Sequence, residues 1–425
     1  MEQYAQILFI AMPSFLVLVL IEKLYGIWKG QDTAPWRDSV SSLSSGMTNV
    51  TKDVLGLSIS IITYELLVDH LAVFTIQNTW LIYIVAFIAI DFHGYWTHRI
   101  CHKVNIFWNI HVIHHSSEEF NLSCALRQSI SSFVNVFTFL LIPAALVGIP
   151  SEVISLILPL HLFMQFWYHT RHIKNMGLLE YIIVTPSHHR VHHAINKEYL
   201  DKNLSQIFII WDKLFGTFQK ELDQVEPIYG ITRPAATWNP IKINFQHLWL
   251  LIKDAWRAPQ IWDKLRIWFM PTGWRPPGFE ELYPVPKISD VYNFRKYRST
   301  PSAALTAYSI IHLVIAMLFI MHFFYNIASI NSLFGFAGLL LYGGHLFLLI
   351  YCLTDLMDSN RWSWFFELFR SGYALFIILF LGSWFGLGET LTWMVLIYHM
   401  ICLIVSFAFV MHFSSASEKP NLTEY

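Results

Sequence analysis

The chain has 425 residues, of which 55% are hydrophobic and only 13% are charged, and its mean hydropathy is +0.45. Because a soluble domain usually carries about 25% charged residues, this composition predicts an integral membrane protein. The net charge of -1 gives no reason to expect a nucleic-acid partner. The four cysteines lie far apart and form no CxxC pair, which argues against a disulfide scaffold or an iron–sulfur site.

The first apolar stretch, residues 7–21, has no basic region before it and no small-residue cleavage site after it. It is therefore predicted to be a retained transmembrane helix. A spanning helix needs about 20 apolar residues. On this criterion the predicted spans are residues 5–27, 54–74, 79–97, 130–149, 151–168, 302–326, 333–353, 373–387 and 389–413. Three prolines in 130–168 leave two alternatives open, a pair of spans or a re-entrant hairpin.

The basic residues predict the orientation of the chain. With the N-terminus outside, the outer loops contain no Lys or Arg, and 21 of the 28 basic residues lie between Arg99 and Arg298. Arg361 and Arg370 also fall on the inner side. By the positive-inside rule, the long polar region between the spans faces the cytosol.

A change in composition divides the chain into three predicted segments. Residues 1–226 form a membrane-embedded segment with its core at about 86–219, residues 227–300 are rich in Pro, Trp and basic residues, and residues 301–425 form a C-terminal transmembrane bundle. Within the middle segment, Phe245–Trp268 alternates aromatic and basic residues at roughly helical spacing. This pattern fits two structures equally, an amphipathic helix in the membrane interface and a cytosolic linker packed on the membrane domain.

Three short runs carry most of the predicted chemistry: Asp91–His102, His111–His115 and His188–His193. Each contains histidines spaced i, i+3 or i, i+4, which places imidazoles on one face of a helix. A catalytic zinc typically takes three protein ligands, and neutral imidazole also suits iron and copper. Eight imidazoles therefore predict two metals. The predicted ligands are His98, His102, His111, His114, His115, His189, His192 and His193.

These runs resemble the fatty acid hydroxylase/sterol desaturase superfamily, and within it most closely the alkylglycerol monooxygenases. The likeness rests on the pattern HxxxH, HxxHH and HxxHH and on the segments NLSCALRQS (121–129), TPSHHRVHH (185–193), DKN (201–203), IWDKLFGTF (210–218) and PIKINFQH (240–247). It is dense from about 86 to 250 and faint in the C-terminal bundle. One departure is Lys103, which stands where some members have an acidic residue.

The resemblance implies an all-α membrane fold, with a di-iron centre in a cytosolic histidine-rich cap. It implies an O2-dependent monooxygenase that hydroxylates a C–H bond of a membrane lipid. An external reductant, either a reduced pterin or an electron-transfer protein, would supply the electrons. The closest likeness implies cleavage of an alkylglycerol ether to a fatty aldehyde. Sterol or fatty-acid hydroxylation or desaturation uses the same ligand pattern and remains an alternative.

Two other classes of function are open to a histidine-rich membrane protein. A metal transporter or metal-storing protein would place ionisable residues in the middle of several spans, whereas the histidine runs lie at predicted span edges and loops. A zinc hydrolase would carry an HExxH motif, which this sequence lacks.

Five further residues are candidates for the centre. His169 ends an apolar run where the family often places another ligand, and it is predicted as either a ninth ligand or a hydrogen-bonding neighbour of the ligands. His188 has the same two alternatives. Asp91 lies on the same helix face as His98, and metal-bound histidines usually donate their outer N–H to a carboxylate or carbonyl. Asn203 and Asp212 are candidates for the same role, with capping or solvation as the alternative.

Overall fold

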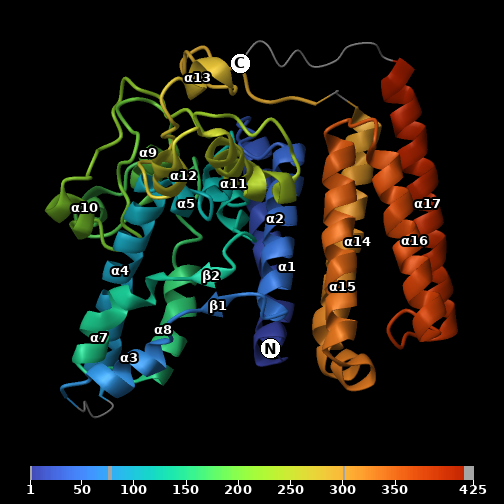
Figure 1. Cartoon of the computed structure of the whole chain (residues 1–425), viewed down its shortest axis with the longest axis horizontal. Coiled ribbons are helices and arrows are strands. Elements are labelled where there is room, and N and C mark those ends of the chain that lie inside the picture. The colour runs from blue at the N-terminus through green and yellow to red at the C-terminus, as the bar shows by residue number, and fades with distance from the viewer. Residues whose placement is uncertain (1, 75–78, 300–301, 416–425) are drawn as a thin grey trace.

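The computed structural model describes residues 2–74, 79–299 and 302–415, and this part of the chain is mostly helical, with long loops and only two short strands (Figure 1). Within these described ranges, six helices are long and apolar enough to cross a membrane. They are α1 (Glu2–Trp28), α4 (Trp80–Lys103), α14 (Ala303–Tyr325), α15 (Ile327–Met357), α16 (Ser363–Leu381) and α17 (Glu389–Ser415). Many of their large apolar side chains are exposed, as lipid-facing side chains must be. The predicted helical membrane architecture is confirmed.

The predicted span 54–74 is wrong. Helix α2 (Trp36–Val54) ends where the span should begin, and after the positive-φ residue Gly56 the chain forms only β1 (Ile59–Ser60) and the eight-residue helix α3 (Tyr64–Leu71). The apolar residues were present, but β1 pairs in parallel with β2 (Val134–Asn135) instead of continuing a helix.

The segment 130–168 forms several short helices and no helix long enough to span a membrane, as a re-entrant hairpin would. After β2 come η2 (Phe137–Leu141), α7 (Ile142–Leu146) and α8 (Ser151–Phe163). The longest, α8, has 13 residues and is about 20 Å long, which is shorter than a hydrocarbon core of about 30 Å. These short helices and α3 pack around α4 in one apolar cluster, so α4 is the long helix at the centre of this region.

The predicted span 373–387 is displaced, because α16 begins at Ser363 and ends before Gly382. Arg370, predicted on the inner side, is therefore buried within a membrane helix. Its guanidinium contacts the carboxylate of Glu367 at 2.6 Å and donates to the hydroxyl of Tyr398. An arginine at this depth requires such partners.

The middle segment contains α11 (Pro240–Arg257), α12 (Ile261–Arg266) and α13 (Phe279–Leu282). The side chain of Asn239 caps α11 by accepting from two backbone N–H groups, and Pro240 occupies its first turn. Figure 1 shows α11 and α12 at one end of the long helices, together with α5 (Asn105–Trp108) and α9 (Pro186–His193). The histidine runs lie at this end.

Candidate metal centre

Four elements bring the histidines together. His98 and His102 lie in the last turns of α4, and the second run forms α6 (Val112–His115) with His111 before it. The third run is α9, and His169 follows α8 in a loop. The nine predicted ligands form two groups, each with its ligand atoms within 4.8 Å of one another. The five-histidine group is His98, His102, His111, His115 and His192, and the four-histidine group is His114, His169, His189 and His193.

The inner nitrogens of each group converge. In the five-histidine group, Nε2 of His98 lies 2.9 Å from Nε2 of His111, and Nε2 of His102 lies 3.2 Å from Nε2 of His115. In the four-histidine group, Nε2 of His189 lies 2.8 Å from that of His169. The neighbours His114 and His115 belong to different groups, so the short helix α6 connects both.

The outer nitrogens fix the tautomers. In four of the rings, Nδ1 lies within hydrogen-bonding distance of a backbone carbonyl oxygen. The distance is 2.7 Å from His98 to Leu204 and 3.0 Å from His192 to Lys202. It is 3.0 Å from His169 to Gln165 and 3.3 Å from His114 to Arg127. A carbonyl oxygen only accepts, so each of these rings carries its proton on Nδ1. In a neutral imidazole, Nε2 is then a bare lone pair.

This arrangement leaves lone pairs facing one another. The Nε2 atoms of His114 and His169 are 3.4 Å apart and neither has a proton to donate, and the buried Nε2 of His192 has no hydrogen-bond partner. Protonation does not resolve the conflict, because burial lowers the pKa of His114 to about 3 and holds the pKa of His169 and His192 well below the usual range. A cation between the rings does resolve it. The donor set therefore fits two metal ions of a kind that binds imidazole.

Asp91 and Asp212 hold the loop next to the five-histidine group. The structure does not bring Asp91 to His98: its carboxylate accepts from His161 (2.8 Å), from the backbone N–H groups of residues 207 and 208, and from Trp211. Asp212 accepts from the backbone N–H groups of residues 204 and 205 at 2.7 and 2.9 Å. Together they fix the loop whose Leu204 carbonyl orients His98.

His188 and Asn203 lie outside both groups. His188 closes a capping box with Thr185 at the start of α9, so its ring faces away from the converging nitrogens. Asn203 adopts φ 52°, a conformation that asparagine tolerates, and donates to the carbonyl oxygens of His188 and Gln219. Both residues fix the backbone around α9 and touch no predicted ligand ring.

Asp201 was not among the candidates, although it belongs to the DKN segment. Its Oδ1 lies 3.2 Å from Nδ1 of His102, and its Oδ2 accepts from Lys103 at 2.5 Å. Metal-bound histidines usually donate their outer N–H to a carboxylate or carbonyl, and Asp201 provides that carboxylate for His102. The only signal for it in the sequence was an acidic residue inside a segment already matched to the family.

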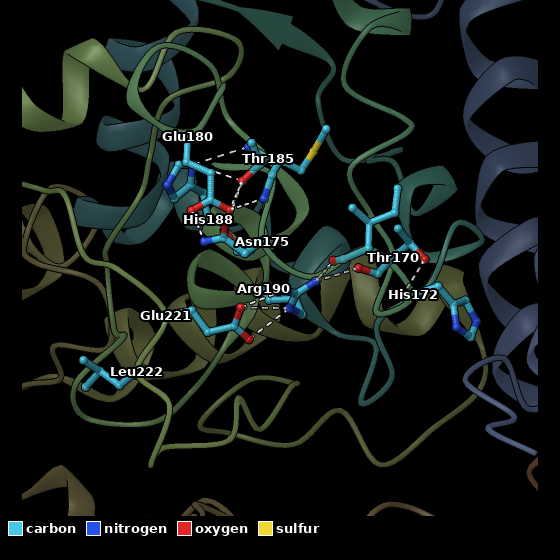
Figure 2. Close-up of polar contacts among 12 residues, drawn as sticks. Thr170, His172, Asn175, Glu180, Thr185, His188, Arg190, Glu221 and Leu222 are labelled. Carbon is cyan, nitrogen blue, oxygen red and sulfur yellow. Dashed lines mark hydrogen bonds and ion pairs between the residues drawn. The ribbon is translucent and has the colours of Figure 1, made fainter. Parts of the chain in front are cut away.

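The outer face of α9 is held by a separate polar network, which Figure 2 shows. Arg190 is buried, and its guanidinium donates to the carboxylate of Glu221 and to the carbonyl oxygens of Thr170 and Ile173. Because His169 directly precedes Thr170, Arg190 joins the loop of one ligand to the helix that carries three others.

One cavity reaches both groups. It has a volume of about 710 Å³, and His102, His115, His192 and His193 lie on its wall. The middle segment contributes much of the remaining wall, including residues 230–236 and 285–287. Trp108 also lies on this wall and packs against His102, while Phe120, outside the cavity lining, packs against His193.

Residues 83–217 match the fatty acid hydroxylase family. The alkylglycerol monooxygenase of Homo sapiens is 36% identical over 329 residues, which cover 76% of this chain and 72% of the human protein. That of Xenopus tropicalis is 33% identical over 368 residues, covering 85% and 80%. The ornithine lipid hydroxylase OlsE of Rhizobium tropici is 27% identical over 153 residues, or 36% of this chain and 46% of that protein. No solved structure matches the chain.

Proposed function

Because the chain belongs to the alkylglycerol monooxygenase family, it is an O2-dependent lipid monooxygenase, and we propose that its substrate is an alkylglycerol ether. One oxygen atom of O2 enters the C–H bond beside the ether oxygen, and the other leaves as water with two electrons and two protons from a reductant. The resulting hemiacetal loses its hydroxyl proton to the glycerol oxygen as the C–O bond breaks. The products are a fatty aldehyde and glycerol.

We propose that two iron ions occupy the centre, one in each histidine group. The convergence of unprotonated Nε2 atoms without a donor between them is the observation that supports this assignment. Bound iron supplies the activation of O2 that an unactivated C–H bond needs, which no side chain provides alone.

The surrounding residues set the geometry of the ligands. The carbonyl oxygens of Leu204, Lys202, Gln165 and Arg127 hold four imidazoles in the Nδ1–H tautomer, and Asp201 does the same for His102. Such outer contacts fix ring orientation and raise ligand basicity. The rings of Phe120 and Trp108 pack against His193 and His102 and limit the movement of those imidazoles.

We further propose that the histidine end faces the cytosol, where the excess of basic residues between Arg99 and Arg298 would place it. The 710 Å³ cavity is then the route for a water-soluble reductant, because the middle segment that lines it lies at the same end. The family likeness favours a reduced pterin, with an electron-transfer protein as the other class of donor.

The test compares one ligand from each group with a buried histidine outside them. His114→Ala and His192→Ala are each expected to lower turnover by more than roughly 100-fold and to reduce bound iron, because loss of a ligand opens the centre. His188→Gln is the matched control on the same helix and should keep most activity. Turnover is measured as fatty aldehyde released from an alkylglycerol, with an acylglycerol of equal chain length as the control substrate.

Two outcomes would contradict the proposal. Equal turnover with and without O2 would exclude a monooxygenase reaction on this substrate. Oxidation of a sterol or fatty acid without aldehyde release from alkylglycerol would reassign the substrate while leaving the metal centre in place.

A further inference from the structure

Helices α11 and α12 carry an exposed aromatic surface, which we define as Trp249, Ile252, Trp256, Ile261, Trp262, Leu265 and Phe269. Trp256 is 84% exposed and Phe269 is 70% exposed. In α11, positions 249, 252 and 256 share one face, while Ile243 and Leu251 are buried on another. One apolar face of α11 is therefore covered by the protein and a second is not.

This surface lies where the chain leaves its membrane-embedded parts. Directly after α4, Val104 pairs with Pro271, and the side-chain amide of Asn105 donates to the carbonyl oxygen of Ile267 at 3.0 Å. At the other end of α11, the side chain of Asn244 accepts from the N–H of Ile130, just before β2. The aromatic surface is thus tied to the ends of two membrane-inserted segments.

The charge of this region is positive. Residues 240–269 contain five basic and two acidic side chains. Both acids are buried in ion pairs, Asp254 with Arg275 and Asp263 with Arg266. Lys242 pairs with the buried carboxylate of Asp355. Lys253 and Arg257 lie along one flank of the exposed stripe of α11, because they follow it at about 60–120° around the helix axis at 3.6 residues per turn. An aromatic stripe beside a basic flank is the pattern of helices that lie in a membrane interface near anionic lipids.

We propose that the aromatic surface rests in the headgroup region of the lipid leaflet on the histidine side. Scattered apolar residues on a surface need no partner, but here seven exposed apolar side chains gather on two consecutive helices, which calls for one. Tryptophan favours the membrane–water boundary, where its ring is apolar and its N–H stays hydrated. Lys253 of the basic flank also lines the 710 Å³ cavity, so this placement brings that cavity to the depth of the lipid headgroups.

Environment-sensitive fluorophores on the full-length protein test this placement. One variant carries a single cysteine in place of Trp256 and another in place of Trp262. Lys197→Cys, at an exposed position shortly after α9, serves as the aqueous reference. The four native cysteines are buried, which confines labelling to the new thiols. The protein is reconstituted into vesicles of phosphatidylcholine and phosphatidylserine. Quenching is then measured with iodide and with phosphatidylcholine that is spin-labelled near its headgroup.

At positions 256 and 262 we expect several-fold stronger quenching by the spin-labelled lipid than at 197, and several-fold weaker quenching by iodide. Iodide quenching equal to that at position 197 would overturn the proposal. Shielding from iodide without lipid quenching, together with fluorophore self-quenching, would also overturn it and assign the surface to a second copy of the chain. None of these readouts requires turnover, so they are independent of the proposed reaction.

Discussion

Asp201 links the predicted ligand His102 to Lys103, which stands where some members of the family have an acidic residue. Its carboxylate contacts Nδ1 of His102 at 3.2 Å and the ammonium of Lys103 at 2.5 Å. Asp201→Asn keeps the size of the side chain and removes its charge. We expect metal affinity to fall by roughly 10-fold or more, because an outer carboxylate orients its histidine and raises its basicity.

Metal retained against a graded series of chelator concentrations measures this effect. Lys103→Met is the control, because it removes an exposed partner and leaves the contact between Asp201 and His102 in place. Equal losses in the two variants would show that the ion pair between Asp201 and Lys103 matters and that the contact from Asp201 to His102 alone does not.

Arg190 acts on the four-histidine group through the backbone. It joins the carbonyl oxygens of Thr170 and Ile173 to α9 (Figure 2). Arg190→Met should release the loop of His169 from His189 and His193, so the four-histidine group should lose metal roughly 10-fold more readily than the other group. The readout is iron stoichiometry, which should fall toward one ion per chain.

Arg171→Met is the matched control for Arg190. Its guanidinium lies in the same loop but pairs with Glu119, and its side chain is partly exposed. If both variants lost iron equally, general loosening of the loop would replace the specific role of Arg190.

At the scale of elements, α2 fits closely against the segment that orients His114. A Cβ added at Gly46 would lie 3.1 Å from the carbonyl oxygen of Leu126, the residue before Arg127. Gly46→Ala should cost about 1–3 kcal/mol of stability through overpacking and weaken the contact from Arg127 to His114. Gly372→Ala, in open space on α16, should change stability by less than about 1 kcal/mol. Thermal unfolding compares the two, and similar losses would refute the packing argument.

The sequence allowed prediction of features that depend on neighbouring residues. Spacing of i, i+4 placed the histidines on helix faces, and the structure brings all nine predicted ligands into two groups. Their division could not be predicted, because it depends on how α4, α6 and α9 meet. Asp91 shows the same limit. Helical spacing placed it on the face of His98, but its carboxylate instead accepts hydrogen bonds from the distant loop 207–211.

Prediction of membrane spans failed where pairing between distant segments decided the structure. Residues 54–74 are apolar enough for a span, yet Ile59 and Ser60 pair with residues 134 and 135. Hydropathy also gave no indication of α2, a serine-rich helix that is largely buried. Small side chains such as Ser41, Ser44 and Ser45 allow neighbouring helices to approach it closely.

At the scale of the whole molecule, the largest apolar core joins the N-terminal segment to the C-terminal bundle. It includes Val40 and Met47 of α2 with Leu346 and Leu353 of α15. The same helix α2 holds Arg127 through Asp38 at 2.8 Å, and the carbonyl oxygen of Arg127 orients His114. The C-terminal bundle therefore supports the centre through α2, although it contributes none of the nine histidines.

Metal removal should lower the stability of the whole chain, because four elements meet at the centre. Ions that bind only the folded state add about 2.7 kcal/mol at a free concentration of 100 times the dissociation constant. Without them, the unprotonated Nε2 atoms of His114 and His169 face each other at 3.4 Å with no proton between them. We expect a strong chelator to lower the melting temperature by several degrees and anaerobic Fe²⁺ to restore it. The double variant His114→Ala, His192→Ala should not respond to either treatment. An equal response of the wild type and the double variant would place the stabilising metal outside the histidine groups.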